Sequence, residues 1–167
     1  RKGTNGRESS SFFGFSQLLE AMGKRRPPIV LLENVTAFLT SHKGSDFRQA
    51  MLELNRLGYC VDPFILDAKW FVPQSRPRLF VIASMIEGDE GYTVEAVPCR
   101  TRPSALVQFI TQHRDIRWSL RRLPPLPLHT KLSLADIIED LADDAPEWWS
   151  KERREYLYNQ MSPRHQG

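Results

Sequence analysis

The sequence predicts an α/β fold, because segments with helical periodicity alternate with short apolar runs. Apolar residues recur at helical spacing over 12–22 and again over 45–57. Three apolar runs of strand length cover 28–32, 60–66 and 78–83. With 167 residues, of which 41% are hydrophobic and 26% charged, the chain is long enough for a domain with a sizeable core. Disordered and fibrous classes are therefore not expected.

Local signals support each of these elements. Gly23, followed by two prolines, ends the first predicted helix. The run 28–32 is continuously apolar, which predicts a strand buried on both faces of a parallel sheet and ending at Glu33. Asp46 in the first turn and Gly58 just past the end delimit the second helix.

The pattern changes from about residue 87, and we predict a domain boundary near Val97, dividing the chain into 1–96 and 97–167. A weaker helix is expected over 105–112. The proline-rich stretch 117–129 predicts an extended connector, or alternatively a proline motif for a partner domain. Ser133 is expected to cap a helix reaching Leu141, and Pro146 to begin another that carries Trp148 and Trp149. Both would be small helices packed on a neighbouring part of the protein.

Composition excludes several other classes. No apolar stretch approaches the roughly 20 residues of a membrane-spanning helix. The two cysteines, Cys60 and Cys99, form no Cys-x-x-Cys pair, so neither a disulfide scaffold nor a structural zinc site is expected, and a reducing compartment fits. Lys and Arg exceed Asp and Glu by three, which permits a polyanionic partner without requiring one. Because the chain begins at Arg1 without a Met, we expect it to be a piece of a longer protein.

Glu33 is the first candidate for chemistry. It follows a predicted strand, and open α/β sheets bind their ligands at the carboxyl ends of the strands. Burial there would raise its pKa and favour a neutral acid able to donate a proton. The alternative is a structural ion pair between Glu33 and a nearby arginine.

Arg76 and Arg78 form the second candidate. On an extended backbone, alternate residues emerge on the same side about 6.6 Å apart. Two guanidinium groups so placed suit a phosphate, a carboxylate, or one of each. The alternative is a sheet edge kept soluble by its arginines, and Pro77 between them also indicates an edge or a position just before a strand.

Glu33-Asn34-Val35, followed about 40 residues later by Gln74-Ser75-Arg76-Pro77-Arg78, resembles the DNA cytosine-5 methyltransferase family. The resemblance extends over residues 1 to about 95. It implies that 1–96 is the second half of a Rossmann-like, S-adenosylmethionine-dependent methyltransferase sheet. It also implies that 97–167 is the start of a small, irregular and partly helical target-recognition region.

The resemblance implies a role for each matching residue. Glu33 would hold and protonate ring nitrogen N3 of a flipped cytosine, and Arg78 would contact the cytosine carbonyl and orient Glu33. Arg76 would hold backbone phosphate, and Gln74 would shape the same loop. The remaining matches are Asn34, which would fix the turn after the strand, Lys2, in a loop that closes over DNA, and Ser11, near the cofactor adenine.

The sequence also departs from the family pattern. Neither the nucleophilic Pro-Cys-Gln motif nor the cofactor loop Phe-x-Gly-x-Gly occurs within it, so we expect the chain alone to be inactive. Pro98-Cys99-Arg100 lies after the Gln74 cluster, the wrong order for the nucleophile. Phe71 occupies a position where glycine is common, and Ser11 one that is often apolar.

The implied partners are double-stranded DNA, S-adenosyl-L-methionine and the missing N-terminal half of the catalytic domain, with no metal and no membrane. The intact enzyme would be bacterial, cytoplasmic and nucleoid-associated, and could belong to a restriction-modification system; the sequence predicts no target site. An isolated half-sheet would expose an edge and an apolar face, so self-association is expected.

Two alternatives remain open. The first is a non-catalytic DNA-binding or interaction module derived from a methylase. The second is an unrelated α/β phosphate-binding domain, although no Gly-x-x-x-x-Gly-Lys-Ser/Thr motif is present to support it.

Overall fold

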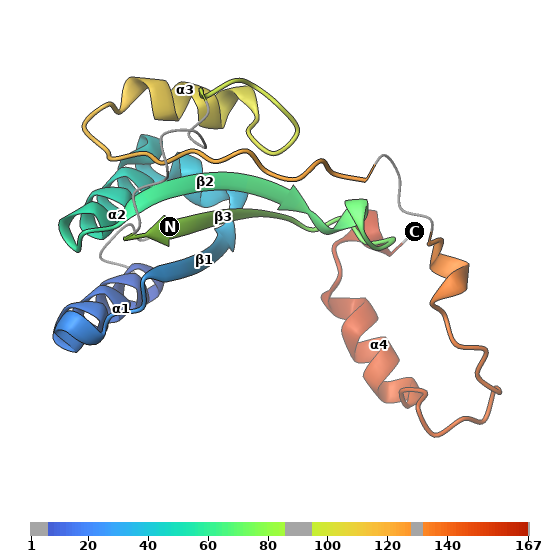
Figure 1. The fold of residues 1–167 in the computed structure, drawn as a ribbon. Helices are drawn as coiled ribbons and strands as arrows, with labels where there is room; N and C mark the ends of the chain where they lie inside the picture. The colour runs from blue at the N-terminus through green and yellow to red at the C-terminus, as the bar shows by residue number, and fades with distance from the viewer. Residues whose placement is uncertain (1–6, 86–94, 128–131, 167) are drawn as a thin grey trace. The chain divides into compact units, whose positions relative to one another are not determined.

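The computed structural model describes residues 7–85, 95–127 and 132–166 (Figure 1). Its helices and strands, in chain order, are α1 (Arg7–Met22), β1 (Ile29–Val35), α2 (Ser45–Arg56), β2 (Cys60–Asp67), β3 (Pro77–Ser84), α3 (Ser104–Gln112) and α4 (Lys151–Gln160). The predicted helices over 12–22, 45–57 and 105–112 and the three predicted strands are all present. The chain folds as two compact units, 1–131 and 132–167, so residues 95–127 belong with the sheet. The functional division near Val97 stays a prediction.

The sheet has three strands in the order β1-β3-β2, and both pairings are antiparallel. The expectation of a parallel sheet was therefore wrong for the strands present here. The connection between β2 and β3 explains this arrangement, because residues 68–76 are too few for the crossover of a dozen or more residues that parallel neighbours need. β1 and β2 consequently run in the same direction on either side of β3 (Figure 1).

β1 is an edge strand and is buried on one face only, which corrects the expectation that both faces are buried. Val30 points into the core and is 8% exposed, whereas Leu31 is 62% exposed. Ile29 and Val35 share the outer face with Leu31 and are also exposed. The strand does not end at Glu33 but continues to Val35, and Glu33 therefore lies within the sheet.

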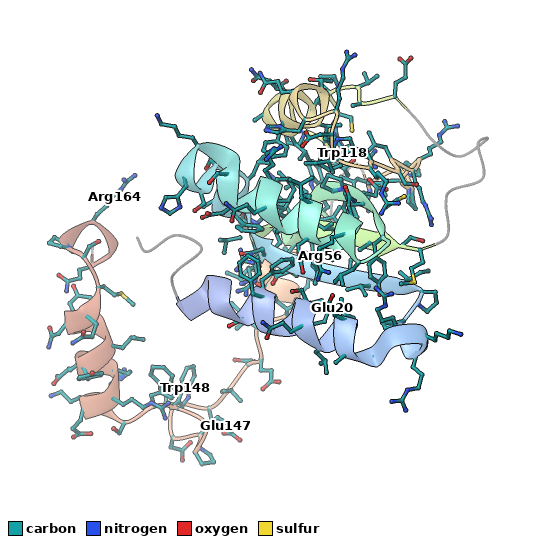
Figure 2. The ribbon with its side chains drawn as sticks, turned by 90° about the vertical axis from the view of Figure 1, so that its left-hand side faces the viewer. Glu20, Arg56, Trp118, Glu147, Trp148 and Arg164 are labelled. Atoms are coloured by element: carbon teal, nitrogen blue, oxygen red, sulfur yellow. The ribbon has the colours of Figure 1, made fainter. Side chains whose placement is uncertain are left out.

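The core lies on the opposite face of the sheet, where three helices cover it. In Figure 2, α1 and α2 lie in front of the sheet, and Glu20 on α1 points toward Arg56 on α2. The helices contribute Leu19, Phe47, Leu54, Leu106 and Phe109, and the strands Val30, Val61, Leu79, Val81 and Ala83. Every second residue of a strand thus points into the core, because successive side chains in a strand lie on opposite faces of the sheet.

Two glycines set the limits of α2. Gly44 precedes the helix with φ of 87°, and a Cβ there would lie 3.0 Å from the ring of Phe109. Gly58 follows it with φ of 96°, the left-handed conformation of a C′ residue. The predicted end of this helix is therefore confirmed.

The segment after α3 is extended, as predicted, but it also pairs with the sheet. Val61 donates its amide to the carbonyl of Arg117, and Ser119 donates to the carbonyl of Val61, at 3.0 and 2.9 Å. Ile65 donates to the carbonyl of Thr101 at 2.7 Å. The outer edge of β2 is thus partly covered, whereas β1 has no strand beyond it among the described residues.

The second unit differs from its predicted form. The capping box of Ser133 leads only into a 3₁₀ turn, Leu134–Asp136, and not into a helix reaching Leu141. Helix α4 begins at Lys151, because the Ser150 hydroxyl caps it by accepting from the Arg153 amide at 3.3 Å. Trp148 and Trp149 therefore lie before the helix, and the start at Pro146 was wrong. No helix in the described part of the chain is long and apolar enough to cross a membrane.

Candidate active site

An ion pair joins two of the three residues for which a catalytic role was predicted, Glu33 and Arg78. Arg78 Nε on β3 lies 2.7 Å from Glu33 Oε1 on β1. In the register, Val35 faces Arg78 and Glu33 faces Phe80, so the two side chains are diagonal neighbours on the face opposite the helical core. An interaction between Glu33 and an arginine was expected, and Arg78 is that arginine.

The surroundings of Glu33 are more open than expected. Its side chain is 50% exposed, whereas that of Arg78 is 23% exposed. The prediction that Glu33 is buried was therefore wrong for this chain, because β1 is an edge strand and the neighbouring Leu31 and Val35 are uncovered too. Asn34 accepts a hydrogen bond from the Val35 amide on its side-chain oxygen at 2.8 Å. This bond shapes the last residues of β1 beside Glu33.

Asp67, at the end of β2, organises the loop that carries the other candidates. Its carboxylate accepts hydrogen bonds from the amides of Lys69 and Arg76, at 3.1 and 2.7 Å, and from the Ser75 hydroxyl at 3.2 Å. Burial acts to raise the pKa of Asp67, but these hydrogen bonds outweigh it and lower the pKa. The sequence analysis missed Asp67. Its place directly after a strand, in a residue type that bonds to nearby backbone amides, was the available signal.

The other predicted site residues are placed as follows. Gln74 and Arg76 are exposed in the loop 68–76, at the end of the sheet that holds Arg78. Ser11 is exposed on α1. Lys2 lies outside the described residues. The structure thus brings together Glu33 and Arg78 and places Gln74 and Arg76 in the adjoining loop.

Comparison with known proteins decides the family. A family model for C-5 cytosine-specific DNA methylases matches residues 1–166. The chain belongs to the C-5 cytosine-specific DNA methylase family. The match covers nearly the whole chain, including α3 and the second unit, and so extends well beyond the motifs around Glu33 and Arg78.

Individual methylases are similar over parts of their length. A DNA-cytosine methyltransferase of Escherichia coli (strain K12) is 34% identical over 84 residues, which are 45% of this chain and 17% of that protein. The type II methyltransferase M.BsuFI of Bacillus subtilis is 38% identical over 66 residues, 39% of this chain and 16% of M.BsuFI. The type II methyltransferase M.SsoII of Shigella sonnei is 27% identical over 164 residues, 95% of this chain and 35% of M.SsoII. The chain thus spans between about a sixth and a third of these relatives.

Cys99 of this methylase chain lines a pocket. The pocket has a volume of about 510 Å³, and Cys99, Arg100, Arg102 and Arg122 are among its lining residues. Burial acts to raise the pKa of the Cys99 thiol, but hydrogen bonds with Thr101 and Arg102 outweigh it and lower the pKa. In the part of the chain that the structure describes, no group of three or more His, Cys, Asp and Glu side chains is placed to hold a metal ion.

We predict that Cys99 reacts with iodoacetamide at least about tenfold faster than Cys60. Cys99 is exposed and has a lowered pKa, so more of it is thiolate, which is the reactive form. Cys60 is buried at the start of β2. Mass spectrometry of the alkylated peptides, followed over time at pH 7, measures both rates, and Cys99→Ser identifies the fast site. Equal rates at the two cysteines would contradict the prediction.

Proposed function

We propose that this chain is the central part of a DNA (cytosine-5-)-methyltransferase. The complete enzyme would transfer a methyl group to C5 of a flipped cytosine in duplex DNA. The Glu33–Arg78 ion pair carries the proposal. The family match and the printed name of the Escherichia coli relative, a DNA-cytosine methyltransferase, support it. Inactivity of the isolated 167-residue chain is part of the same proposal, because it contains no Pro-Cys-Gln motif.

Glu33 is proposed to hold the flipped base. Its carboxyl group would bind ring nitrogen N3 and donate a proton there, which makes ring carbon 6 electrophilic enough for attack by a cysteine thiolate from outside this chain. Oε1 is engaged by Arg78 Nε, which fixes the orientation of the carboxyl group. Arg78 would also donate to the cytosine carbonyl. The bound base would supply, at Glu33 itself, the burial that the isolated chain lacks.

Arg76 is proposed to bind backbone phosphate near the reacting base. Its guanidinium group is exposed and forms no ion pair within the described residues, and its backbone is fixed by Asp67. Gln74 and Asn34 would help to shape the loop and the end of β1 around the base. Lys2 would belong to a loop that closes over the DNA.

S-adenosyl-L-methionine would supply the methyl group. Ser11, the one residue for which the family resemblance implies a cofactor contact, is exposed on the surface of α1. We therefore propose that the cofactor binds mainly to parts of the protein outside this chain, and we derive no step from Ser11.

The open edge of β1 and its outer face support a place for those missing parts. Among the described residues, no strand pairs with the outer edge of β1, and Ile29, Leu31 and Val35 form an exposed apolar row beside Glu33. We propose that strands of the remaining catalytic domain extend the sheet at β1, giving the Rossmann-like sheet expected from the family, and that other parts cover the apolar row. Without them, the isolated chain would self-associate through the same surfaces.

Residues 97–167 are proposed to begin the target-recognition region. The stretch 97–127 contains six arginines and one acidic residue, Asp115, whereas 132–150 contains six acidic residues and no lysine or arginine. Phosphate contacts of this region would therefore come from 97–127. We place the complete enzyme in the bacterial cytoplasm at the nucleoid, where DNA is available.

A second candidate function is a DNA-binding module without catalysis. The absence of a Pro-Cys-Gln motif between Arg1 and Gly167 favours it for the chain taken alone. Such a module would fold cooperatively and bind DNA with strong salt dependence, because phosphate contacts release counterions.

One experiment separates the two candidates. The complete protein encoded by the reading frame that contains these residues is incubated with duplex DNA and S-adenosyl-L-methionine carrying a labelled methyl group. We expect label in cytosine with the complete protein and none with the 167-residue chain. Salt-sensitive binding without any transfer by the complete protein would favour the binding module, and transfer by the 167-residue chain would refute its proposed inactivity.

A further inference from the structure

Aromatic and cationic side chains gather at the loop between β2 and β3, residues 68–76. Phe71 and Val72 are 52% and 38% exposed. Next to them, the half-buried Trp70 has two cations over its ring, with Lys69 Nζ 5.4 Å and Arg100 Cζ 4.8 Å from the ring centroid. Both distances are within the range of cation–π attraction. Arg100 comes from a segment distant in sequence, so the fold assembles this group.

The loop is held in shape before any partner binds. Asp67 accepts from the Lys69 and Arg76 amides, and Phe71 and Val72 donate their amides to the Ala68 carbonyl at 2.8 and 2.9 Å. A loop that is already ordered loses little conformational entropy on binding. The loop backbone that carries the partly exposed Phe71 is therefore held in place by its own hydrogen bonds.

The loop is also beside the proposed site and has a positive surface. Leu66 and Val35 both face Arg78 in the sheet register, so the loop begins just past the row of residues that contains Arg78. Lys69, Arg76 and Arg100 are its exposed cations. Of the described acidic groups near these cations, Asp67 is engaged by the loop backbone and by Lys69 Nζ at 3.4 Å, and Glu33 is engaged by Arg78. Glu95 lines a pocket together with Arg100.

We propose that Phe71, with Arg100 held on Trp70, is a DNA-contacting surface that positions the substrate beside Glu33. Phe71 would contact an unstacked base, and Arg100 a phosphate. Aromatic rings beside cations are the combination with which proteins bind unstacked nucleic acid. A protein partner fits less well, because lysine is depleted at the centre of protein interfaces. The proposal rests on the proposed function and names further positioning residues of the same site.

The test measures binding of the complete protein, original and variant, to a fluorescently labelled duplex that carries one mismatched cytosine, by anisotropy at several salt concentrations. Phe71→Ala is expected to weaken binding about tenfold at an unchanged salt slope, since stacking involves no counterion release. Phe71→Tyr keeps the ring and should bind like the original protein. Arg100→Gln should lower the slope of log K against log salt by about one.

Control changes are made at exposed positions outside the loop. Leu18 on α1 and Arg25 before β1 are both exposed, so Leu18→Ala removes an exposed apolar side chain and Arg25→Gln removes an exposed charge. Both should bind DNA like the original protein. Thermal unfolding of every variant confirms that it is folded, as expected for exposed positions.

Three results would overturn the proposal. The first is absence of salt-dependent DNA binding by the original protein. The second is binding by Phe71→Ala and Arg100→Gln that matches the controls. The third is a change in sedimentation of Phe71→Ala with unaltered DNA binding, which would show that Phe71 contacts protein. If the complete protein fails to transfer methyl groups but the variants still show the predicted loss of DNA binding, the proposed function is refuted and the DNA-contacting surface is not.

Discussion

Replacing Glu33 with Gln in the complete protein is expected to reduce the rate of methyl transfer by about 10²–10⁴-fold, the usual contribution of a general acid. Gln keeps the size of the side chain and can still hydrogen-bond to the base, but it has no acidic proton to donate. The expected loss is therefore in kcat, with a smaller effect on KM for DNA. Single-turnover transfer of a labelled methyl group to duplex DNA measures the chemical step directly.

Arg78→Lys provides a graded companion to Glu33→Gln. Lysine keeps the charge but not the planar guanidinium group whose Nε lies 2.7 Å from Glu33 Oε1. We expect a smaller loss than in Glu33→Gln, and little further loss when both changes are combined, because Arg78 acts partly through Glu33.

The matched control for Glu33→Gln is Glu20→Gln on α1. Glu20 also pairs with an arginine, Arg56, and its side chain is 55% exposed, close to the 50% of Glu33. Transfer by Glu20→Gln should remain within about twofold of the original, as for surface changes in general. Full activity of Glu33→Gln would remove Glu33 from the proposed chemistry.

The secondary structure of the first unit could largely be predicted from local signals. Helical periodicity, with Asp46 in the first turn and Gly58 just past the end, located α2, and apolar runs located all three strands. Sheet topology could not be predicted in this way. A continuous apolar run such as 28–32 indicates burial on both faces, yet Leu31 is exposed, because β1 lies at the edge of a three-stranded sheet.

The helices of the second unit and the burial of Glu33 were predicted less well. Two residues, Pro146 and Ser150, are both typical of a helix start. The helix begins after Ser150, whose side chain caps it. Glu33 and Arg78 were identified through the family resemblance, but the exposure of Glu33 depends on what lies beyond β1, which no local pattern contains. The Arg100–Trp70 contact depends on long-range geometry as well, whereas Asp67 bonds to residues close to it in sequence.

A buried ion pair in the first unit also escaped the sequence analysis. Asp62 on β2 and Arg102 are 2% and 5% exposed at their side chains, and Arg102 Nη2 lies 2.6 Å from Asp62 Oδ1. The second carboxylate oxygen accepts from the Arg121 amide at 3.0 Å, and Arg102 donates to the Arg121 carbonyl at 2.9 Å. These bonds join strand β2 to two later segments of the chain, those around Arg102 and Arg121. Within the described residues, Arg102 Nε has no hydrogen-bond partner.

Arg102→Met is expected to lower the free energy of unfolding by about 3–5 kcal/mol, because it leaves the Asp62 carboxylate buried without its counter-charge. The double variant Asp62→Val/Arg102→Met should recover most of this loss, since it removes both charges and the unpartnered Nε. Urea denaturation of the three chains measures the differences. Arg48→Met, which breaks the exposed pair with Asp115, is the control and should cost less than about 1 kcal/mol.

The pH dependence of Arg102→Met gives a second, independent check. Burial raises the pKa of Asp62, whereas the hydrogen bond and charge of Arg102 lower it, so removing Arg102 should raise that pKa further. A carboxyl group whose pKa is higher in the folded than in the unfolded state favours folding at low pH, and that contribution is lost as the pH rises through the folded pKa. The deficit of Arg102→Met relative to the original chain should therefore shrink between pH 7 and pH 5. A deficit that stays constant over this range would mean that the lost stability comes from packing around Arg102 rather than from the unpaired charge of Asp62.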